Sequence, residues 1–271
     1  AEGLSFFPDY GGYGFGPERY LDLVRRAKEA LGIPVIASLN CVSQSGWVDY
    51  ARGLQGVGAD AIELDIYFVP TDLTMAGRDV EQRHLDILAA VKAAVTIPVA
   101  VKIGPYFSAP GAMALALAES GADGLVLFNR VCPPDIDVAT LRLSLDLELS
   151  TPAEMRLPLL WIAVLHGRVP AALAASTGVE SADDVFKYLL VGADVVMTTA
   201  ALLRHGAGHM RNLVDGLTAL LSARDIDSLD AIRGRMSMRH LKDPMAFERA
   251  AYVHMLQSYG VSHRHAAGGK P

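Results

Sequence analysis

The sequence predicts an α/β fold in which parallel strands alternate with helices, and three observations support this prediction. Of the 271 residues, 51% are hydrophobic, so the chain can bury a large core and is not expected to be disordered. Short, almost uninterrupted apolar runs recur along the chain, as expected of parallel strands that are covered on both faces. Longer amphipathic segments separate these runs and are typical of connecting helices.

Six apolar runs have the length and composition of strands. They are Ile33–Leu39, Asp60–Ile66, Pro98–Ile103, Asp123–Asn129, Ala171–Ser176 and Asp194–Thr198. Helices are predicted at Glu18–Leu31, Trp47–Val57, Val80–Ala94, Ala109–Ser120, Leu157–Leu165, Ser181–Val191, Ala200–Arg204 and from about His209 onward.

One short sequence motif recurs where a predicted helix is followed by the next strand. Its three copies read GVGAD at 56–60, ESGAD at 119–123 and LVGAD at 190–194. Glycine suits the left-handed position that ends a helix, and aspartate then opens the strand. Repetition of this turn favours a (β/α)8 TIM barrel over a doubly wound sheet, because no strand is followed by the Gly-rich fingerprint of the latter.

Six βα units are two fewer than a complete barrel needs. We therefore expect the chain to be the larger part of a longer one, lacking the first two βα units and containing strands three to eight. Alternating leucines at 141–149 predict a β-hairpin insertion. The predicted division is an N-terminal loop and helix at 1–32, a barrel core at 33–206, and a C-terminal helical extension and tail at 207–271.

Composition narrows the classes of partner. Lys and Arg number 24 and Asp and Glu 30, so the net charge of −6 argues against nucleic acid and against an anionic membrane surface. No apolar run reaches the roughly 18 residues that span a bilayer. Two cysteines cannot form a disulfide framework, and the first residues lack the pattern of a signal peptide, so we expect a cytoplasmic protein.

In a barrel, reactive groups lie where the strands end and the βα loops begin. Lys102 lies inside the apolar run PVAVKI, so its ammonium group is expected at the mouth of the barrel. There it could form a Schiff base or neutralise an anionic cofactor ring. The structural alternative is an ion pair with Glu63 or Asp65 on the neighbouring strand.

Hydroxyl groups cluster after the last two strands. Ser176, Thr177 and Gly178 follow one strand, and Thr198 and Thr199 follow the next. Hydroxyls and an open backbone beside a helix N-terminus suit a phosphate group, whereas the alternative is ordinary helix capping, for which Ser181 is well placed.

Asn40 and Asn129 end two further strands. A carboxamide there can bind a heterocycle or substrate through paired donor and acceptor groups, or it can simply form a turn. The chain contains no HExxH, paired CxxC, Walker A or GxSxG motif, so neither a metal site nor a serine hydrolase is predicted.

Taken together, five segments resemble the dihydroorotate dehydrogenase family. They are ADAIELDIYFVPTD (59–72), PVAVKIGPYFS (98–108), ADGLVLFNR (122–130), STGVESADDVFKYLLVGADVVMTTAALLRHG (176–206) and SLDAIRGRMS (228–237). The resemblance implies a (β/α)8 barrel that holds FMN at the carboxyl ends of its strands. It also implies an oxidation in which a base takes a proton from a dihydropyrimidine while hydride passes to the flavin.

The resemblance assigns roles residue by residue. Lys102 matches the lysine that lies against the flavin ring, and Asn129 matches an asparagine near flavin and substrate. Residues 177–178 match a Gly-Gly phosphate loop, and residues 199–200 match a Gly-Thr pair.

The fourth-strand motif departs from the family pattern. Where the family has Glu-Leu-Asn-hydrophobic-Ser-Cys-Pro-Asn, this sequence has ELDIYFVP. Phe68 stands at the position of the base and cannot accept a proton. Asp65 places a carboxylate where the family has a substrate-binding amide, which disfavours an anionic ring. Tyr67, Asp65, Ser43 and Cys41 are candidates for a replacement base.

The leading hypothesis is an FMN-dependent oxidoreductase of the pyrimidine-biosynthesis type, acting on dihydroorotate or a related cyclic small molecule. Lys102, Asp65 and Tyr67 are the predicted catalytic residues, and Asn40, Asp65 and Asn129 the predicted substrate-binding residues. The alternatives are a phosphate-binding aldolase or lyase that uses Lys102, and a non-catalytic barrel that has lost its base. The expected partner is a second copy or an electron-transfer protein, which would have to carry any iron–sulfur cluster because this chain lacks the cysteines.

Overall fold

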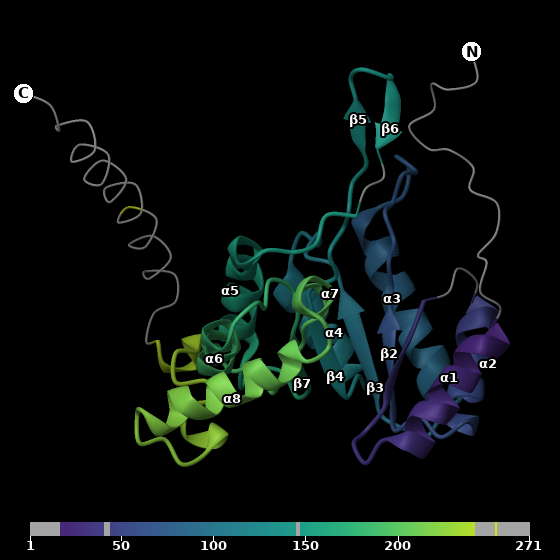
Figure 1. The fold of residues 1–271 in the computed structure, drawn as a ribbon. Coiled ribbons are helices and arrows are strands. Elements are labelled where there is room, and N and C mark those ends of the chain that lie inside the picture. Colours follow the sequence, from purple (N-terminus) through teal and green to yellow (C-terminus); the bar gives the residue numbers. More distant parts are fainter. Residues whose placement is uncertain (1–16, 41–43, 145–146, 242–252, 254–271) are drawn as a thin grey trace, which may run out of the picture.

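A computed structural model describes residues 17–40, 44–144, 147–241 and 253. Its main body is a parallel sheet that curls like half of a barrel, with strand order β1-β2-β3-β4-β7-β8 (Figure 1). The strands are β1 (Ile36–Leu39), β2 (Ala61–Asp65), β3 (Val99–Ile103), β4 (Gly124–Leu127), β7 (Ala172–Ala175) and β8 (Val195–Val196). Their order in space follows the chain without a reversal, so the six predicted parallel strands are confirmed.

Helices connect the strands as predicted. They are α1 (Pro17–Ala30), α2 (Gln44–Gly56), α3 (Gly77–Lys92), α4 (Pro110–Glu119), α5 (Arg156–Leu165), α6 (Ala182–Val191), α7 (Ala200–His205) and α8 (His209–Ser222). Figure 1 shows α1, α2 and α3 beside one end of the sheet and α5, α6 and α8 beside the other. Among the described helices, none is long and apolar enough to cross a membrane.

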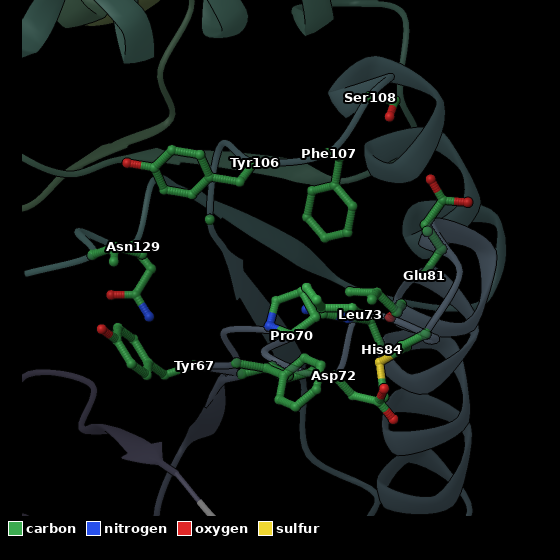
Figure 2. A pocket seen from close by; sticks show the side chains of 17 residues that line it. Tyr67, Pro70, Asp72, Leu73, Glu81, His84, Tyr106, Phe107, Ser108 and Asn129 are labelled. Carbon is green, nitrogen blue, oxygen red and sulfur yellow. Dashed lines mark hydrogen bonds between the residues drawn. The ribbon is translucent and has the colours of Figure 1, made fainter. Parts of the chain in front are cut away.

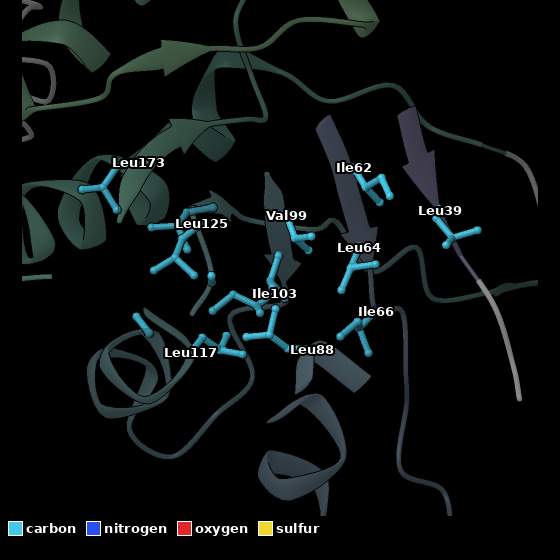
Figure 3. Close-up of a cluster of buried hydrophobic side chains, with 14 of the residues drawn as sticks. Leu39, Ile62, Leu64, Ile66, Leu88, Val99, Ile103, Leu117, Leu125 and Leu173 are labelled. Carbon is cyan, nitrogen blue, oxygen red and sulfur yellow. The ribbon is translucent and has the colours of Figure 1, made fainter. Parts of the chain in front are cut away.

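The core lies between the sheet and these helices. Alternate strand side chains face the helices, among them Ile62 and Leu64 of β2 and Leu125 of β4, all with an exposed fraction of 0%. Leu88 of α3 and Leu117 of α4 pack against them (Figure 3). The intervening strand positions face the concave side of the sheet, and this is where the polar strand residues are placed.

The repeated Gly-Ala-Asp turn has a structural basis that goes beyond the sequence prediction. Its three glycines adopt positive φ angles of 91°, 98° and 113°, and the alanine that follows each glycine is buried. Each aspartate carboxylate accepts a hydrogen bond from a backbone N–H of the preceding, neighbouring strand segment: Asp60 from Val35, Asp123 from Val99 and Asp194 from Leu173. The turn therefore fastens each new strand to the one beside it.

The segment after β4 forms a two-stranded antiparallel hairpin of β5 (Asp135–Asp137) and β6 (Arg142–Ser144), which projects from the body (Figure 1). Only part of the leucine alternation at 141–149 is therefore strand. That the hairpin is an insertion into a complete barrel stays a prediction, as do the two further βα units and the domain boundaries at 32/33 and 206/207.

The helical extension predicted at 207–271 is not a continuous helix, because residues 228–237 are not α-helical. The structure has short 3₁₀ turns there, at Leu229–Ala231 and, after an intervening turn, Met238–His240. Gly234 adopts a φ of 73°, and a Cβ at this position would lie 2.1 Å from Nε2 of His166, so the chain bends where a helix would continue. The predicted N-terminal loop before residue 17 and the predicted C-terminal extension after residue 241 lie outside the described residues, apart from Val253.

Candidate active site

Three charged side chains meet on the concave face of the sheet. Asp65 of β2 is in register with Lys102 of β3, so the side chains of these two residues are neighbours across the strands. The Lys102 ammonium lies 3.4 Å from Oδ2 of Asp65 and 3.7 Å from Oε1 of Glu63. Glu63 is buried, and its carboxylate also accepts a hydrogen bond of 2.9 Å from the Ser38 hydroxyl. The structural alternative for Lys102, an ion pair with Glu63 or Asp65, is therefore present, and it involves both carboxylates.

Asn129 joins this cluster from the loop after β4. Its backbone N–H donates to the Ile103 carbonyl at 2.8 Å, which extends the strand pairing and fixes the start of the loop. Its side-chain amide donates to Oδ1 of Asp65. Asp65 is consequently held between an ammonium and an amide, and among the described residues no donor binds the Asn129 side-chain oxygen.

A first cavity of about 300 Å³ opens beside Lys102 and Asn129, at the carboxyl ends of β4, β7 and β8. All five of the predicted phosphate-loop residues line it: Ser176, Thr177, Gly178, Thr198 and Thr199. The hydroxyls of Ser176 and Thr177 donate to the Phe128 carbonyl at 2.9 and 3.4 Å, and that of Thr198 donates to the Val179 carbonyl at 2.9 Å. The protons of these three hydroxyl groups are therefore engaged by backbone carbonyls.

Gly178 is required by a close approach of the chain. It has a φ of 79°, and a Cβ there would lie 2.7 Å from the Thr151 carbonyl oxygen. Its backbone N–H donates to the Ser150 hydroxyl at 3.2 Å. Capping of α6 is performed by Ser181 and Asp184, whose side chains each bond to the other's backbone. Ser181 therefore caps α6, as the capping alternative expects, while residues 176–178 line the cavity and their role in binding phosphate stays a prediction.

Residues 147–150 form one side of the first cavity. Arg130 donates to the Glu148 carbonyl and binds the Glu154 carboxylate at 2.7 Å. Arg204 donates to the carbonyls of Leu149 and Ser150 at 3.0 and 2.9 Å. Sequence reasoning missed both arginines, because their contacts join segments that are far apart in the chain.

A second cavity of about 360 Å³ lies on the other side of Asn129, between the loops that follow β2 and β3 and the first turns of α3. Four aromatic side chains line it: Tyr67, Phe68, Tyr106 and Phe107. Figure 2 shows Tyr67 and Tyr106 on one side of this space and Glu81 and His84 on the other. Phe68, the residue at the family's base position, contributes to the wall, and the Arg83 guanidinium lies 4.3 Å from the centroid of its ring.

The predicted site residues are thus brought together with one exception. Asn129 lines both cavities, Lys102 the first and Tyr67 the second. Asn40 is exposed after β1 and lines neither of these two cavities, so its predicted role in substrate binding stays a prediction. Cys41 and Ser43, named above as alternative bases, lie outside the described residues.

Comparison with known proteins identifies relatives of this arrangement. A family profile described as dihydroorotate dehydrogenase matches residues 14–221. A protein of Aeropyrum pernix, provisionally named dihydroorotate dehydrogenase A (fumarate), is 30% identical over 78% of this chain and 70% of its own length. The catalytic subunit of dihydroorotate dehydrogenase B (NAD(+)) from Thermoplasma acidophilum is 25% identical over 81% of this chain and 73% of its own.

A third relative has a different named activity. The NAD-dependent dihydropyrimidine dehydrogenase subunit PreA of Escherichia coli is 26% identical over 80% of this chain, which spans 56% of that protein. The profile match covers most of the chain, and the described strands form the parallel half-barrel sheet. The chain belongs to the dihydroorotate dehydrogenase family and is an oxidoreductase of that family.

Proposed function

We propose that this chain binds FMN in the first cavity and oxidises dihydroorotate or a related cyclic compound by hydride transfer to the flavin. One observation carries the proposal: Lys102 and Asn129 line a cavity whose other end is formed by the hydroxyl-bearing loops after β7 and β8. The Lys102 cation would lie beside the ring system of a flavin mononucleotide, and the loops after β7 and β8 would hold its phosphate. To donate to that phosphate, the Ser176, Thr177 and Thr198 hydroxyls would turn their protons away from the backbone carbonyls that accept them in this structure.

The residues present fit this cofactor. Met197, Val179 and Leu203 supply apolar surface to the cavity, as a planar ring system requires. The distances of 3.4 and 3.7 Å from the Lys102 ammonium to its two carboxylates are long for ion pairs, so its donors retain capacity for a further acceptor. When bound, FMN would supply the chemistry of hydride acceptance.

The side chains of this chain then have distinct tasks. Lys102 holds a positive charge beside the cavity, where it favours negative charge on an adjacent ring. Asn129 offers its side-chain oxygen at the junction of the two cavities, and Asp65 keeps the asparagine amide in place. Asp65 and Tyr67 are the groups we propose for proton transfer, because Phe68 has no basic atom.

The visible spectrum of the purified chain tests the cofactor. We expect flavin absorption, either as isolated or after incubation with FMN, and bleaching when an oxidisable substrate is added without oxygen. A Lys102→Met variant should bind FMN more weakly, since it removes the cation from the cavity. A colourless protein that takes up no added FMN overturns the proposal.

The aldolase or lyase alternative depends on an uncharged Lys102 amine. In the structure this side chain is instead paired with the carboxylates of Glu63 and Asp65. Borohydride trapping of a carbonyl compound on Lys102 would support that alternative. A protein that binds FMN but is bleached by no candidate substrate would support the non-catalytic reading that Phe68 suggests.

We also propose a partner and a location. Two of the relatives are named as subunits, one of them as a catalytic subunit, which supports an electron-transfer partner for this chain. A cytoplasmic location is proposed on composition, in keeping with two cysteines in 271 residues.

A further inference from the structure

The second cavity combines aromatic walls with an unusual set of polar groups. Besides its four aromatic side chains it is lined by Asp72, Glu81, His84, Ser108 and Asn129. The carboxylates can only accept hydrogen bonds, and one of the two N–H groups of the Asn129 amide is already donated to Asp65. The cavity therefore offers mainly acceptors, with hydroxyl groups that can serve either way.

His84 adds a further acceptor. Its side chain is buried, at 3% exposed, and its ring packs edge-on against Phe107 with centroids 5.3 Å apart. Nδ1 lies 2.8 Å from the Val80 carbonyl, which can only accept, so Nδ1 carries the proton and Nε2 has a lone pair. Among the described residues, the bond from Nδ1 is the hydrogen bond that the His84 ring makes. Burial lowers the pKa of His84, so the ring is neutral near pH 7.

The charged groups in the cavity are negative. Hydrogen bonds from the Thr74 backbone and hydroxyl lower the pKa of Asp72, which keeps that carboxylate ionised. Glu81 on α3 makes no ion pair within the described ranges. Within those ranges no lysine or arginine lines the cavity, and the nearby Arg83 guanidinium is stacked on the ring of Phe68. A ligand carboxylate here would face two like charges without a lining cation.

We propose that the second cavity is the substrate compartment and that it takes an uncharged or cationic cyclic compound bearing N–H donors, in preference to a carboxylate. The aromatic walls would cover a planar or nearly planar ring, and His84, Glu81 and the Asn129 oxygen would accept from its N–H groups. The inference rests on the proposed function only in naming this ligand the substrate of a flavin in the adjoining cavity, and among the substrates proposed there it selects related cyclic compounds without a carboxylate over dihydroorotate.

Three probes of nearly equal size and shape test the charge preference directly. Benzamidine is cationic, benzamide is neutral with N–H donors, and benzoate is anionic. We expect ligand-observed NMR titration of the purified chain to show benzamide and benzamidine binding at least about tenfold more tightly than benzoate. Equal or tighter binding of benzoate, or no binding of any probe, overturns the proposal.

Two variants locate the preference in this cavity. Glu81→Gln removes one lining carboxylate with little change in size. It should reduce the ratio of the benzamide affinity to the benzoate affinity by about threefold or more. Glu119→Gln makes the same change at an exposed site at the end of α4 and should leave this ratio unchanged. A ratio unaltered by Glu81→Gln, or reduced equally by both variants, contradicts the assignment.

The test separates this inference from the proposed function. A chain that binds FMN but prefers benzoate refutes the charge preference and leaves the flavin site standing. A chain that selects benzamide but takes up no FMN refutes the flavin site and leaves the cavity's selectivity standing. In FMN-loaded protein the same preference predicts that uracil binds more tightly than orotate, because orotate adds a carboxylate to the same ring.

Discussion

At the scale of single residues, Lys102 neutralises two carboxylates on one strand. Glu63 has a side-chain exposure of 7% and Lys102 one of 21%, so their charges are poorly screened by water. Removing the cation leaves both acids facing each other on the concave side of the sheet. Such a loss is usually more damaging than the net contribution of the pair, because a buried charge is left uncompensated.

The first prediction follows from this arrangement. Lys102→Met should lower the free energy of unfolding in urea by about 2–4 kcal/mol. Adding Glu63→Gln should restore part of the loss, since it removes the more buried of the two acids. If Lys102→Met alone has the same free energy of unfolding as the parent chain, the pairing of Lys102 with the two carboxylates contributes nothing to stability.

His84 gives the second prediction. Burial lowers its pKa below the usual 6.5, so in acid the unfolded chain takes up the proton first. The neutral ring therefore stabilises the fold above about pH 6.5, and this contribution is lost as the pH falls toward the lower pKa of the folded state.

The measurement is a comparison across pH. The chain should lose stability to urea between about pH 7 and pH 5, and a His84→Phe variant, which keeps a ring against Phe107, should lose less over the same range. Parallel pH profiles for the two proteins would show that His84 is not held neutral.

Residue-level prediction from the sequence succeeded where a charge interrupts an apolar run. Lys102 stood out in this way, and its partners Glu63 and Asp65 followed from the neighbouring strand. His84 and Glu81 carry no such signal, because a polar residue on an amphipathic helix is ordinary. Their role depends on α3 lying against the loop after β3, which requires the fold.

At the scale of elements, the three Gly-Ala-Asp turns determine where strands begin. The sequence predicts the glycine and its left-handed conformation. The bond from each aspartate to the adjacent strand could not be predicted, because it joins residues 21 to 25 positions apart. Lys92 adds an ion pair of 2.8 Å to Asp123, so this turn also ties α3 to β4.

The third prediction concerns that turn. Asp123→Ala leaves the Val99 N–H without its acceptor and should cost about 1–3 kcal/mol of stability. Asp215→Ala, at an exposed position of α8, removes the same side chain where no hydrogen bond is described and serves as the control. Equal effects of the two variants in thermal denaturation would show that the turn's hydrogen bond contributes nothing.

At the scale of the whole molecule, α8 packs against α6 closely enough to make glycine necessary. A Cβ at Gly216 would lie 2.7 Å from the Cβ of Ala182, which is nearer than two carbon atoms can pack. The C-terminal segment also continues the body beyond α8, because the backbone N–H groups of Gly234 and Met236 donate to carbonyls of Leu189 and Leu190.

The fourth prediction tests this packing. Gly216→Ala improves intrinsic helix propensity but forces the two helices apart, and we expect a net loss of about 1–3 kcal/mol. Gly208→Ala meets nothing within 4 Å and provides the matched control. If Gly216→Ala instead raises the melting temperature, the helices adjust to each other and the contact does not hold the C-terminal segment in place.

The order of strands and helices could be predicted from the sequence, whereas the lining of the second cavity could not. Strand order and helix order follow from the repeat of one βα unit, since each unit adds beside the last. The second cavity could not be predicted, because the residues that line it come from three loops and a helix whose relative positions no local pattern specifies.

Asn129 belongs to both cavities, and this has a thermodynamic consequence. A ligand that binds in one cavity and moves the Asn129 side chain also changes the surface that Asn129 presents to the other cavity. Whatever factor one ligand imposes on the affinity of the second, the second must impose on the first. Titrating a ligand of either cavity with and without a ligand in the other should therefore yield the same coupling constant. The hydrogen bond from Asn129 to Asp65 is the contact through which this coupling would act.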